Sequence, residues 1–435
     1  MRAMTSAHRL AAAVALALAP LAACAPRPSG TPWARVMEAT PSFLAGVTAG
    51  DPSLAVDRGG RVALTWVTRD SAGVGADAWL SVSADSGHHW SDPTRLNVAP
   101  GMVSSYPESR PVAAWGRDGL LVAAWASKRA PRQGNGDDLA TRVSPDGGRT
   151  WGTMHLVNGD RDDPTSGYHG FAAVDVLPDG RPIVAWIDGR ASAGLADEPA
   201  LAEIYASTSA DGGVTWSQDA WLAGDVCACC RIAMRSAQRL NGAIDVAVAY
   251  RGATNDLRDP RVVVSHDGAR RFVLDTLISV DRWKLPGCPS VGPVLTLENG
   301  GGHYFWYTGE SPADSVLPGR PVPGLYLVPW RVEVGATGPK RELGDSLGNA
   351  SRPMIATLGR GTLLGAIGES PGAAGRRVLA LRRLEPDGSI TPWLFLGSGV
   401  KSGAIATHGE QGAWAAWTEP GGEGPRVRVA RLSVR

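Results

Sequence analysis

An eight-residue phrase with the pattern S-x-D-x-G-x-x-W recurs along this chain. Full copies begin at Ser83, Ser144 and Ser209, and a weaker copy runs from Ser265 to Phe272. In each full copy the Ser and Asp side chains can accept hydrogen bonds from backbone N–H groups, and the Gly can adopt a positive φ. These are the requirements of a tight turn between two strands. A phrase repeated in this way predicts a fold assembled from similar units.

A second signature lies upstream of each phrase: a turn rich in Gly and Asp, followed by an apolar strand that ends in an aromatic residue. The strands end at Trp66, Trp125, Trp186, Tyr250 and Trp306, with weaker copies ending at Ala366 and Trp417. Successive ends are 59, 61, 64, 56, 60 and 51 residues apart by subtraction. This spacing predicts seven units, each the size of a four-stranded antiparallel propeller blade.

The segments between the turns are patterned as strands, as in Arg61–Trp66 and Pro182–Trp186. The 55 Gly and 32 Pro residues fit a chain of short strands and tight turns. The seventh unit, Gly403–Arg435, has room for only about three strands, whereas Trp33–Val47 is strand-capable and otherwise unassigned. We therefore expect an all-β, seven-bladed propeller over residues 33–435, a single domain closed by its N-terminal strand.

The repeated phrase resembles the Asp-box, or BNR repeat, of the sialidase-like β-propellers. In that family the Asp-boxes lie away from the catalytic centre, so the resemblance implies a fold more directly than an activity. It implies a structural role for Asp85, Asp146, Asp211 and Asp267. Sialidases themselves have six blades, so six is the alternative to the count of seven.

The N-terminus is typical of an export signal, because basic residues precede an apolar run, Leu10 to Leu21, that is too short to span a membrane. The Leu-Ala-Ala-Cys that follows resembles a bacterial lipobox. This implies a signal peptide at 1–23, a lipid on Cys24 and a tether at 24–32. Ala25 resembles the signal for the outer membrane, so we expect an exported protein anchored to the cell envelope. An ordinary secretory signal is the alternative.

The charge balance excludes one class of partner. The chain has 43 Lys and Arg residues against 42 Asp and Glu residues, and no basic stripe stands out. Nucleic acid is therefore not expected as a partner, because its recognition depends on clustered positive charge.

Four cysteines are left when Cys24 is set aside: Cys227, Cys229, Cys230 and Cys288. In the predicted blade scheme the first three lie in the connection between the third and fourth units, and Cys288 lies in the matching connection one blade later. Such connections converge on one mouth of the central channel. We therefore expect the four thiols to form one cluster.

Three interpretations of this cluster stay open. In an exported protein an even number of cysteines favours structural disulfides. A bridge between the neighbours Cys229 and Cys230 would be strained, so Cys288 is expected to pair with Cys227 or with one of those two. A redox pair is another interpretation, because Arg231 would lower the pKa of a neighbouring thiol.

The third interpretation is a thiolate metal site. A C-x-C-C sequence with one distant cysteine offers up to four soft ligands, which suit Cu(I) or Zn(II). Met234 is a candidate thioether ligand and His169, in the connection one blade earlier, is a candidate imidazole ligand. Both residue types ordinarily have other roles: Met234 would pack in the core, and His169 would be a hydrogen-bonded surface group.

The sialidase resemblance also implies three arginines that clamp a substrate carboxylate, a Tyr nucleophile activated by a Glu, and an Asp acting as acid and base. The arginines expected at the mouth are Arg110, Arg231, Arg251 and Arg352. The candidates for the nucleophile pair are Tyr307 or Tyr304 with Glu310. The candidate acids are Asp51, Asp188 and Asp256. The family's Arg-Ile-Pro signature ahead of the first Asp-box is missing, which weakens the case for hydrolysis.

The leading prediction is thus a binding protein without turnover, with a small ligand, a glycan or a soft metal such as copper at the propeller mouth. An exo-sialidase-type glycoside hydrolase is the first alternative. The second is a protein-interaction scaffold in which the cysteines form structural disulfides.

Overall fold

The computed structural model describes residues 32–435 except 71–72, 74, 130–135, 164, 193–201, 312–321 and 373–374. The compact unit with the propeller runs from Trp33 to Arg435. The predicted signal peptide 1–23 and the predicted lipid site Cys24 lie outside the described residues. Within them, no helix is long and apolar enough to cross a membrane.

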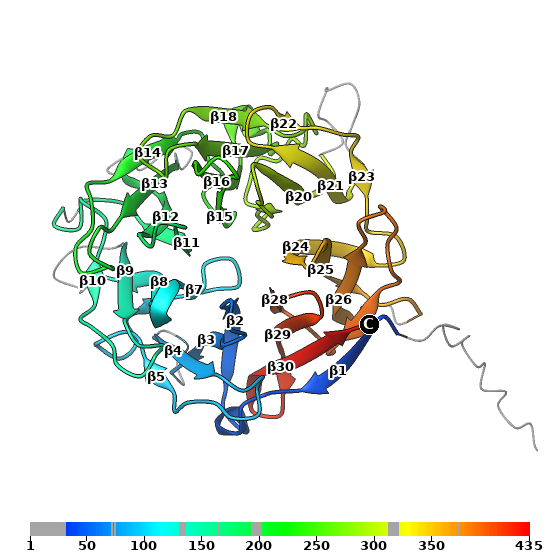
Figure 1. The fold of residues 1–435 in the computed structure, drawn as a ribbon, viewed down its shortest axis with the longest axis horizontal. Helices are drawn as coiled ribbons and strands as arrows, with labels where there is room; N and C mark the ends of the chain where they lie inside the picture. Colours follow the sequence, from blue (N-terminus) through cyan, green and yellow to red (C-terminus); the bar gives the residue numbers. More distant parts are fainter. Residues whose placement is uncertain are drawn as a thin grey trace, which may run out of the picture. The chain divides into compact units, whose positions relative to one another are not determined.

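The strands of the described residues form seven antiparallel sheets set around a ring, each one blade of a propeller (Figure 1). Blade 1 contains β2 (Ala49–Val56), β3 (Val62–Arg69), β4 (Ala76–Ser83) and β5 (Thr94–Arg95). Blade 2 contains β7 (Val112–Trp115), β8 (Leu121–Lys128), β9 (Asp137–Ser144) and β10 (His155–Leu156), with β6 (Val103–Ser104) also paired to β8. Blade 3 contains β11 (His169–Val176), β12 (Pro182–Asp188), β13 (Glu203–Thr208) and β14 (Ala220–Ala223).

The other four blades repeat this order. Blade 4 contains β15 (Ala233–Gln238), β16 (Ile244–Arg251), β17 (Pro260–Ser265) and β18 (Leu274–Leu277). Blade 5 contains β19 (Val294–Leu295), β20 (Gly301–Thr308), β21 (Gly324–Arg331) and β22 (Gly335–Ala336), with β23 (Arg341–Glu342) also paired to β21. Blade 6 contains β24 (Gly348–Leu358), β25 (Gly361–Glu369), β26 (Arg377–Leu384) and β27 (Leu394–Leu396). Blade 7 contains β28 (Ser402–His408), β29 (Gly412–Gly421), β30 (Gly424–Val434) and β1 (Ala34–Glu38).

The ring closes through the N-terminal strand, as the sequence predicts. In Figure 1 the blue β1 lies beside the red β30, and their register pairs Ala34 with Val434 and Glu38 with Ala430. Strand β1 thereby becomes the outer strand of blade 7 and covers an edge that would otherwise be open to pairing with another chain. The predicted seven-bladed, all-β fold is confirmed, and the family's six blades do not apply here.

The core lies between neighbouring blades. The second strand of each blade is an apolar run because it is covered on both faces, and the aromatic residue near its end fills the gap to the next blade. Trp125 and Trp186, for example, are both fully buried. Apart from the strands, the described residues contain short 3-10 turns at Ser42–Leu44, Arg117–Gly119, Arg190–Ser192 and Thr254–Asp256.

The Asp-boxes are the turns between the third and fourth strands. In the second copy, Asp146 accepts hydrogen bonds from the backbone N–H groups of Arg149 and Thr150, and Ser144 Oγ accepts one from Gly148 N at 2.7 Å. Gly148 has a φ of +89°. The weaker fourth copy has Ala269 at the equivalent position, also with a positive φ, +65°.

Strand direction separates the two faces of the ring. The connections from one blade to the next lead into the first strands, so they share one face, which we call the connection face. Because successive strands are antiparallel, the turns between third and fourth strands lie on the opposite face, which we call the Asp-box face. The cysteines and the candidate arginines belong to the connection face.

Candidate functional site

Three arginines lie just before or within the first strands of alternate blades. They are Arg110, Arg231 and Arg352, which belong to blades 2, 4 and 6, and we call them the arginine trio. The same interval separates them, since 231 − 110 = 121 and 352 − 231 = 121. Each is followed by a Pro or an Ile. Equivalent positions in three blades therefore carry the same charged side chain around one end of the channel.

Glu108 is the carboxylate that joins this trio. Its Oε1 accepts a hydrogen bond from Arg352 Nη1 at 2.9 Å and lies 3.6 Å from Arg231 Nη1. Its Oε2 accepts a hydrogen bond at 3.2 Å from the backbone N–H of Gly292, in the connection between blades 4 and 5. The Glu108 side chain is only 2% exposed. One buried carboxylate thus ties together groups from blades 2, 4 and 6 and the connection into blade 5.

The trio has more positive than negative charge. Arg110 donates to Gly403 O at 2.7 Å, and Arg231 donates to Pro353 O at 2.6 Å, so both guanidinium groups also bind backbone carbonyls. Burial and the neighbouring charge of Arg231 lower the pKa of Arg110 to about 9, although Glu108 and Asp51 act in the opposite direction. Desolvation and mutual repulsion disfavour the charged guanidinium, so an additional anion at this position would be stabilising.

Asp51 does not supply that anion. Its carboxylate accepts a hydrogen bond from Arg69 Nη2 at 2.7 Å, and Arg69 also donates to Ser105 O. Asp51 and Arg69 therefore form a pair of their own at the edge of the trio.

A cavity of about 160 Å³ lies beside Arg110 and Arg231 of the trio. Glu108, Arg110 and Arg231 line it together with largely apolar residues of the first strands, such as Leu54, Val112, Ile232, Met354 and Ile405. Ligand pockets usually have volumes of about 300 to 1,000 Å³. This cavity therefore has room for one small polar group, and the bulk of a larger ligand would stay at the mouth.

Backbone strain occurs repeatedly at this mouth. Asp51, Phe171 and Arg352 have φ values of 51°, 57° and 56°. Each lies at a β-bulge in the first strand of its blade, in β2, β11 and β24. A bulge redirects a side chain, and a left-handed conformation at a residue other than Gly costs about 1 to 3 kcal/mol. The strain is typical of a functional site.

Tyr106 stands at the rim of the mouth, near Glu108. The residue is 42% exposed, and its ring packs edge-on against Phe171, with ring centroids 5.4 Å apart. Burial, followed by the negative charges of Asp137 and Glu108, raises the pKa of Tyr106. No motif in the sequence predicts a role for Tyr106 or Glu108. The sequence signal for them is position, because Tyr106 and Glu108 lie four and two residues before Arg110 in the same connection.

The remaining sialidase-type candidates lie elsewhere. Arg251 is fully buried and donates to the carbonyl oxygens of Val291, Arg258 and Tyr307, so it holds backbone together instead of joining the trio. The Tyr307 ring packs edge-on against Trp283, and Glu310 is exposed. The fully buried Tyr304 donates to Arg261 O. The structure therefore brings together three of the four candidate arginines without the candidate nucleophile pair.

The four cysteines do form one cluster beside the trio. A disulfide joins Cys229 to Cys288, with their Cα atoms 6.0 Å apart. Cys227 and Cys230 are free thiols, both buried, with Sγ atoms 2.9 Å apart. The hydrogen bond from Cys230 lowers the pKa of Cys227 to about 6 against the effect of burial, with help from Arg251 among others. Burial raises the pKa of Cys230.

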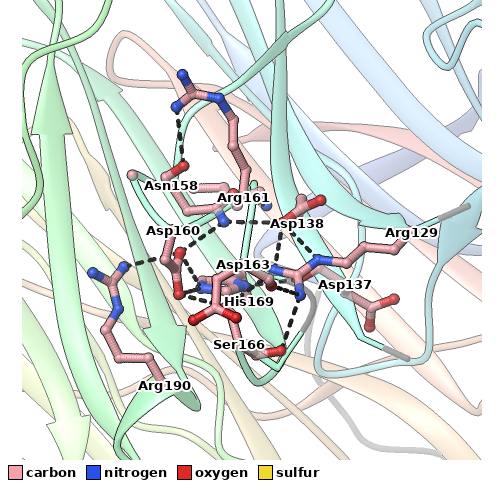
Figure 2. A network of polar contacts seen from close by, with 12 residues as sticks. Arg129, Asp137, Asp138, Asn158, Asp160, Arg161, Asp163, Ser166, His169 and Arg190 are labelled. Atoms are coloured by element: carbon pink, nitrogen blue, oxygen red, sulfur yellow. Dashed lines mark hydrogen bonds and ion pairs between the residues drawn. The ribbon is translucent and has the colours of Figure 1, made fainter. Parts of the chain in front are cut away.

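Met234 and His169 do not join the cysteines in one ligand group. Met234 packs in an apolar core cluster. His169 lies in a separate polar network, shown in Figure 2, where its Nδ1 is 2.7 Å from Asp137 O and its Nε2 is 3.0 Å from Asp160. The Nε2 atom also lies 3.3 Å from Asp188 Oδ2. The side chain of Arg190 pairs with Asp188 as well.

Within the network around His169, the carboxylates offset the effect of burial on the imidazole. Burial lowers the pKa of His169, but hydrogen bonds to Asp160 and Asp188 outweigh burial and raise this pKa to about 9. The imidazole is therefore protonated near neutral pH. Asp188, a candidate acid from the sequence, is fully buried in the same network and away from solvent.

A family model described as the BNR repeat-like domain matches residues 29–254. Among curated proteins, no sequence matches the chain.

Several solved structures have a similar fold at low sequence identity. A polysaccharide lyase of family PL25, an ulvan lyase bound to -[GlcA(1-4)Rha3S]-, is 10% identical over 91% of this chain and 95% of its own, with a TM-score of 0.55. The polysaccharide lyase Uly1 is 12% identical over 88% of this chain and 90% of its own, with a TM-score of 0.53. The Hadza microbial sialidase Hz136 is 13% identical over 89% of this chain and 66% of its own, with a TM-score of 0.48. At these identities the likeness concerns the fold alone.

Proposed function

Because this chain belongs to the BNR repeat-like domain family, we propose that it is a sialidase-like propeller that binds a carboxylate-bearing ligand, a small acid or an acidic glycan, without turning it over. The observation that carries the proposal is the arginine trio, set at equivalent positions of alternate blades: Arg110 and Arg231 line one cavity, and Arg352 pairs with Glu108 in its wall. The trio has three positive charges and shares one close carboxylate, Glu108.

The chemistry of the guanidinium group suits a carboxylate. Its planar N–H fork matches the two oxygens of a carboxylate, and such charge-assisted pairs are among the stronger hydrogen bonds in proteins. The cavity of about 160 Å³ would admit the carboxylate alone. A sugar ring would then lie at the rim, where the exposed ring of Tyr106 is available for packing.

Binding without turnover is favoured by the state of Tyr106. A tyrosine nucleophile must be activated by a base or by a lowered pKa. The pKa of Tyr106 is instead raised by burial and by the charges of Asp137 and Glu108, which keeps its phenol protonated. An exo-sialidase-type hydrolase is the alternative. It requires that a bound ligand change the surroundings of Tyr106 so that its phenol can be deprotonated.

Calorimetric titration with N-acetylneuraminic acid, its methyl ester and glucuronic acid tests the proposal. The acids should bind and the ester should not, because esterification removes the carboxylate charge. Arg231→Ala should weaken binding about 10- to 100-fold, the effect of losing one hydrogen bond to a charged group. Arg149→Ala is the matched control, since Arg149 is exposed on the Asp-box face and uses only its backbone there.

Two results would overturn this proposal. Equal affinity for the acid and its ester would remove the carboxylate from recognition. Turnover of a fluorogenic sialoside that is lost in Arg352→Ala would replace binding by the hydrolase alternative.

A soft metal is a second candidate ligand, at the cysteines. The Sγ atoms of Cys227, Cys229 and Cys230 lie within 4.8 Å of one another, and thiolates suit Cu(I) or Zn(II). Four ligands would require reduction of the Cys229–Cys288 disulfide. Metal analysis of protein purified with and without reductant tests this. About one metal per reduced chain is expected, and its absence would leave the cysteines without a metal role.

The lipid anchor on Cys24 and a location in the outer membrane also belong to the proposal. In cell fractionation, the substitution Cys24→Ala should shift the protein from the membrane fraction to the soluble fraction. An unchanged distribution would favour an ordinary secretory signal.

A further inference from the structure

We propose that Cys227, Cys229, Cys230 and Cys288 form a dithiol–disulfide exchange centre, in which one disulfide alternates between the pair Cys229–Cys288 and the pair Cys227–Cys230. This goes beyond carboxylate binding and does not depend on it.

Geometry brings the free thiol of Cys227 within reach of both of its exchange partners. Its Sγ lies 3.8 Å from Cys229 Sγ, which belongs to the disulfide, and 2.9 Å from Cys230 Sγ. A disulfide bond is about 2.05 Å long, so each new bond requires a sulfur to move by less than about 2 Å. Cys227 and Cys230 also have the C-x-x-C spacing of redox-active pairs.

The exchange balances without any external oxidant. In the first step the Cys227 thiolate attacks Cys229 Sγ. The Cys227–Cys229 bond forms, the Cys229–Cys288 bond breaks, and the electron pair leaves on the Cys288 sulfur. In the second step Cys230 gives up its proton and attacks Cys227 Sγ, and the electron pair leaves on the Cys229 sulfur. One of the released sulfurs takes up the proton. One disulfide and two further sulfurs are present before and after.

Because the four cysteines differ in burial, the exchange moves a free thiol towards the surface. Cys227 is 3% exposed and Cys230 is fully buried, so external reagents reach these thiols poorly. Cys288, in contrast, is exposed. The first step therefore converts a buried thiol into a thiol at the surface, where it can react with an external thiol reagent.

The position of the disulfide also affects how the trio is held. The Cys229–Cys288 bond ties the connection into blade 4 to the connection into blade 5. In that second connection Gly292 donates to Glu108 and lies so close to Arg231 that a Cβ would be 1.9 Å from Arg231 O. After exchange the covalent tie is internal to the first connection. Only non-covalent contacts then hold Gly292 against Arg231, so the trio is held less firmly. An effect of this change on ligand binding would rest on the proposed function.

Alkylation and disulfide mapping test the centre without any ligand. The metal-free native protein is treated with N-ethylmaleimide at pH 8, then acid-quenched, digested and analysed by mass spectrometry. We expect both linkages, Cys229–Cys288 and Cys227–Cys230, in different molecules of one sample, with Cys288 alkylated in the second population. Cys227→Ser is the control variant, because without the attacking sulfur Cys288 should stay in its disulfide and alkylation of Cys288 should be lost.

Three outcomes would overturn the proposal. Both linkages in the same molecule would make the cysteines two fixed bridges. Cys229–Cys288 as the sole linkage of the wild-type protein would show that no exchange occurs. Alkylation of Cys288 at the same rate in the wild type and in Cys227→Ser would show that Cys227 is not the attacking group.

Discussion

On the Asp-box face, Asp146 accepts hydrogen bonds from residues three and four positions away, within its own turn. On the connection face, Glu108 binds Gly292 and Arg352, which are 184 and 244 positions away. The Asp-box turns therefore satisfy their own polar groups and can be repeated in each blade. The groups at the mouth satisfy one another only after the ring has formed.

The difference explains why the Asp-box turn recurs as a complete local pattern, whereas at the mouth the arginines recur but share one carboxylate partner, Glu108. A self-contained turn tolerates any neighbour, so several copies persist with one pattern. A charged group whose partners come from other blades depends on the closed ring for its pairing, and it stays available for a ligand when its partners do not fully neutralise it. The comparison predicts that changes on the connection face affect stability and binding together, whereas changes on the Asp-box face affect stability alone.

The largest effect is expected for Glu108→Ala. Removal of one partner from a buried ion pair typically costs about 3 to 5 kcal/mol, because the other charges are left uncompensated. Here the uncompensated groups are Arg231 and Arg352. Urea unfolding should show this loss, and Glu108→Gln, which keeps the shape and an acceptor oxygen, should lose less. A loss below about 1 kcal/mol would place Glu108 among weak surface pairs.

A pH-dependent loss is expected from the His169 network. The folded pKa of His169, about 9, lies above its ordinary value of 6.5. The imidazolium therefore stabilises the fold in full below about pH 6.5, and this contribution is lost as the pH rises through about 9. Its size is about 3 kcal/mol, from about 1.36 kcal/mol per pKa unit. Denaturation from pH 6 to 10 measures it, and His169→Gln should flatten the curve.

Ser144→Ala, a change on the Asp-box face, should lower the stability of the protein by a smaller amount. The buried Ser144 Oγ accepts the hydrogen bond of Gly148 N, and an unpaired N–H at this position should cost about 1 to 3 kcal/mol. Asp146→Ala should lower the melting temperature as well. Neither variant should change ligand affinity in calorimetry. A variant that abolished binding at an unchanged melting temperature would contradict the separation of the two faces.

The smallest effect is expected for Ala269→Gly in the fourth Asp-box. Ala269 has a φ of +65°, where a side chain costs about 1 to 2 kcal/mol and Gly has no such penalty. The entropy of Gly in the unfolded chain offsets part of this gain, which leaves about 0.5 to 1 kcal/mol of stabilisation. Gly148→Ala is the control with the opposite sign, because its Cβ would lie 2.9 Å from Val82 Cγ2.

Local and repeated features could be predicted from the sequence. The Asp-boxes, the blade count and the closing strand are carried by short patterns with a regular interval, so the fold follows from them. Arg110, Arg231 and Arg352 could be named individually, but Arg251 was grouped with them. The equal interval of 121 residues is the sequence signal that separates the trio from Arg251.

The partners at the site could not be predicted, for physical reasons. Glu108 is one acidic residue among many until the ring brings Arg352 to it across 244 positions. His169 was expected beside the cysteines, but its neighbour Tyr168 is the residue that reaches them, through a hydrogen bond to Ala228 O. Successive residues of an extended chain point to opposite sides, so His169 enters the network with Asp160 instead.

The pairing of β1 with β30 determines when folding can finish. During synthesis Ala34–Glu38 is made long before its partner Ala430–Val434. Contacts between residues so far apart form slowly, because the intervening chain must be ordered before they stabilise anything. Until then one edge of blade 7 stays open for pairing with another chain. Ring closure is therefore expected to be the late, slow step of folding, and the unclosed chain is the species most in need of protection from aggregation.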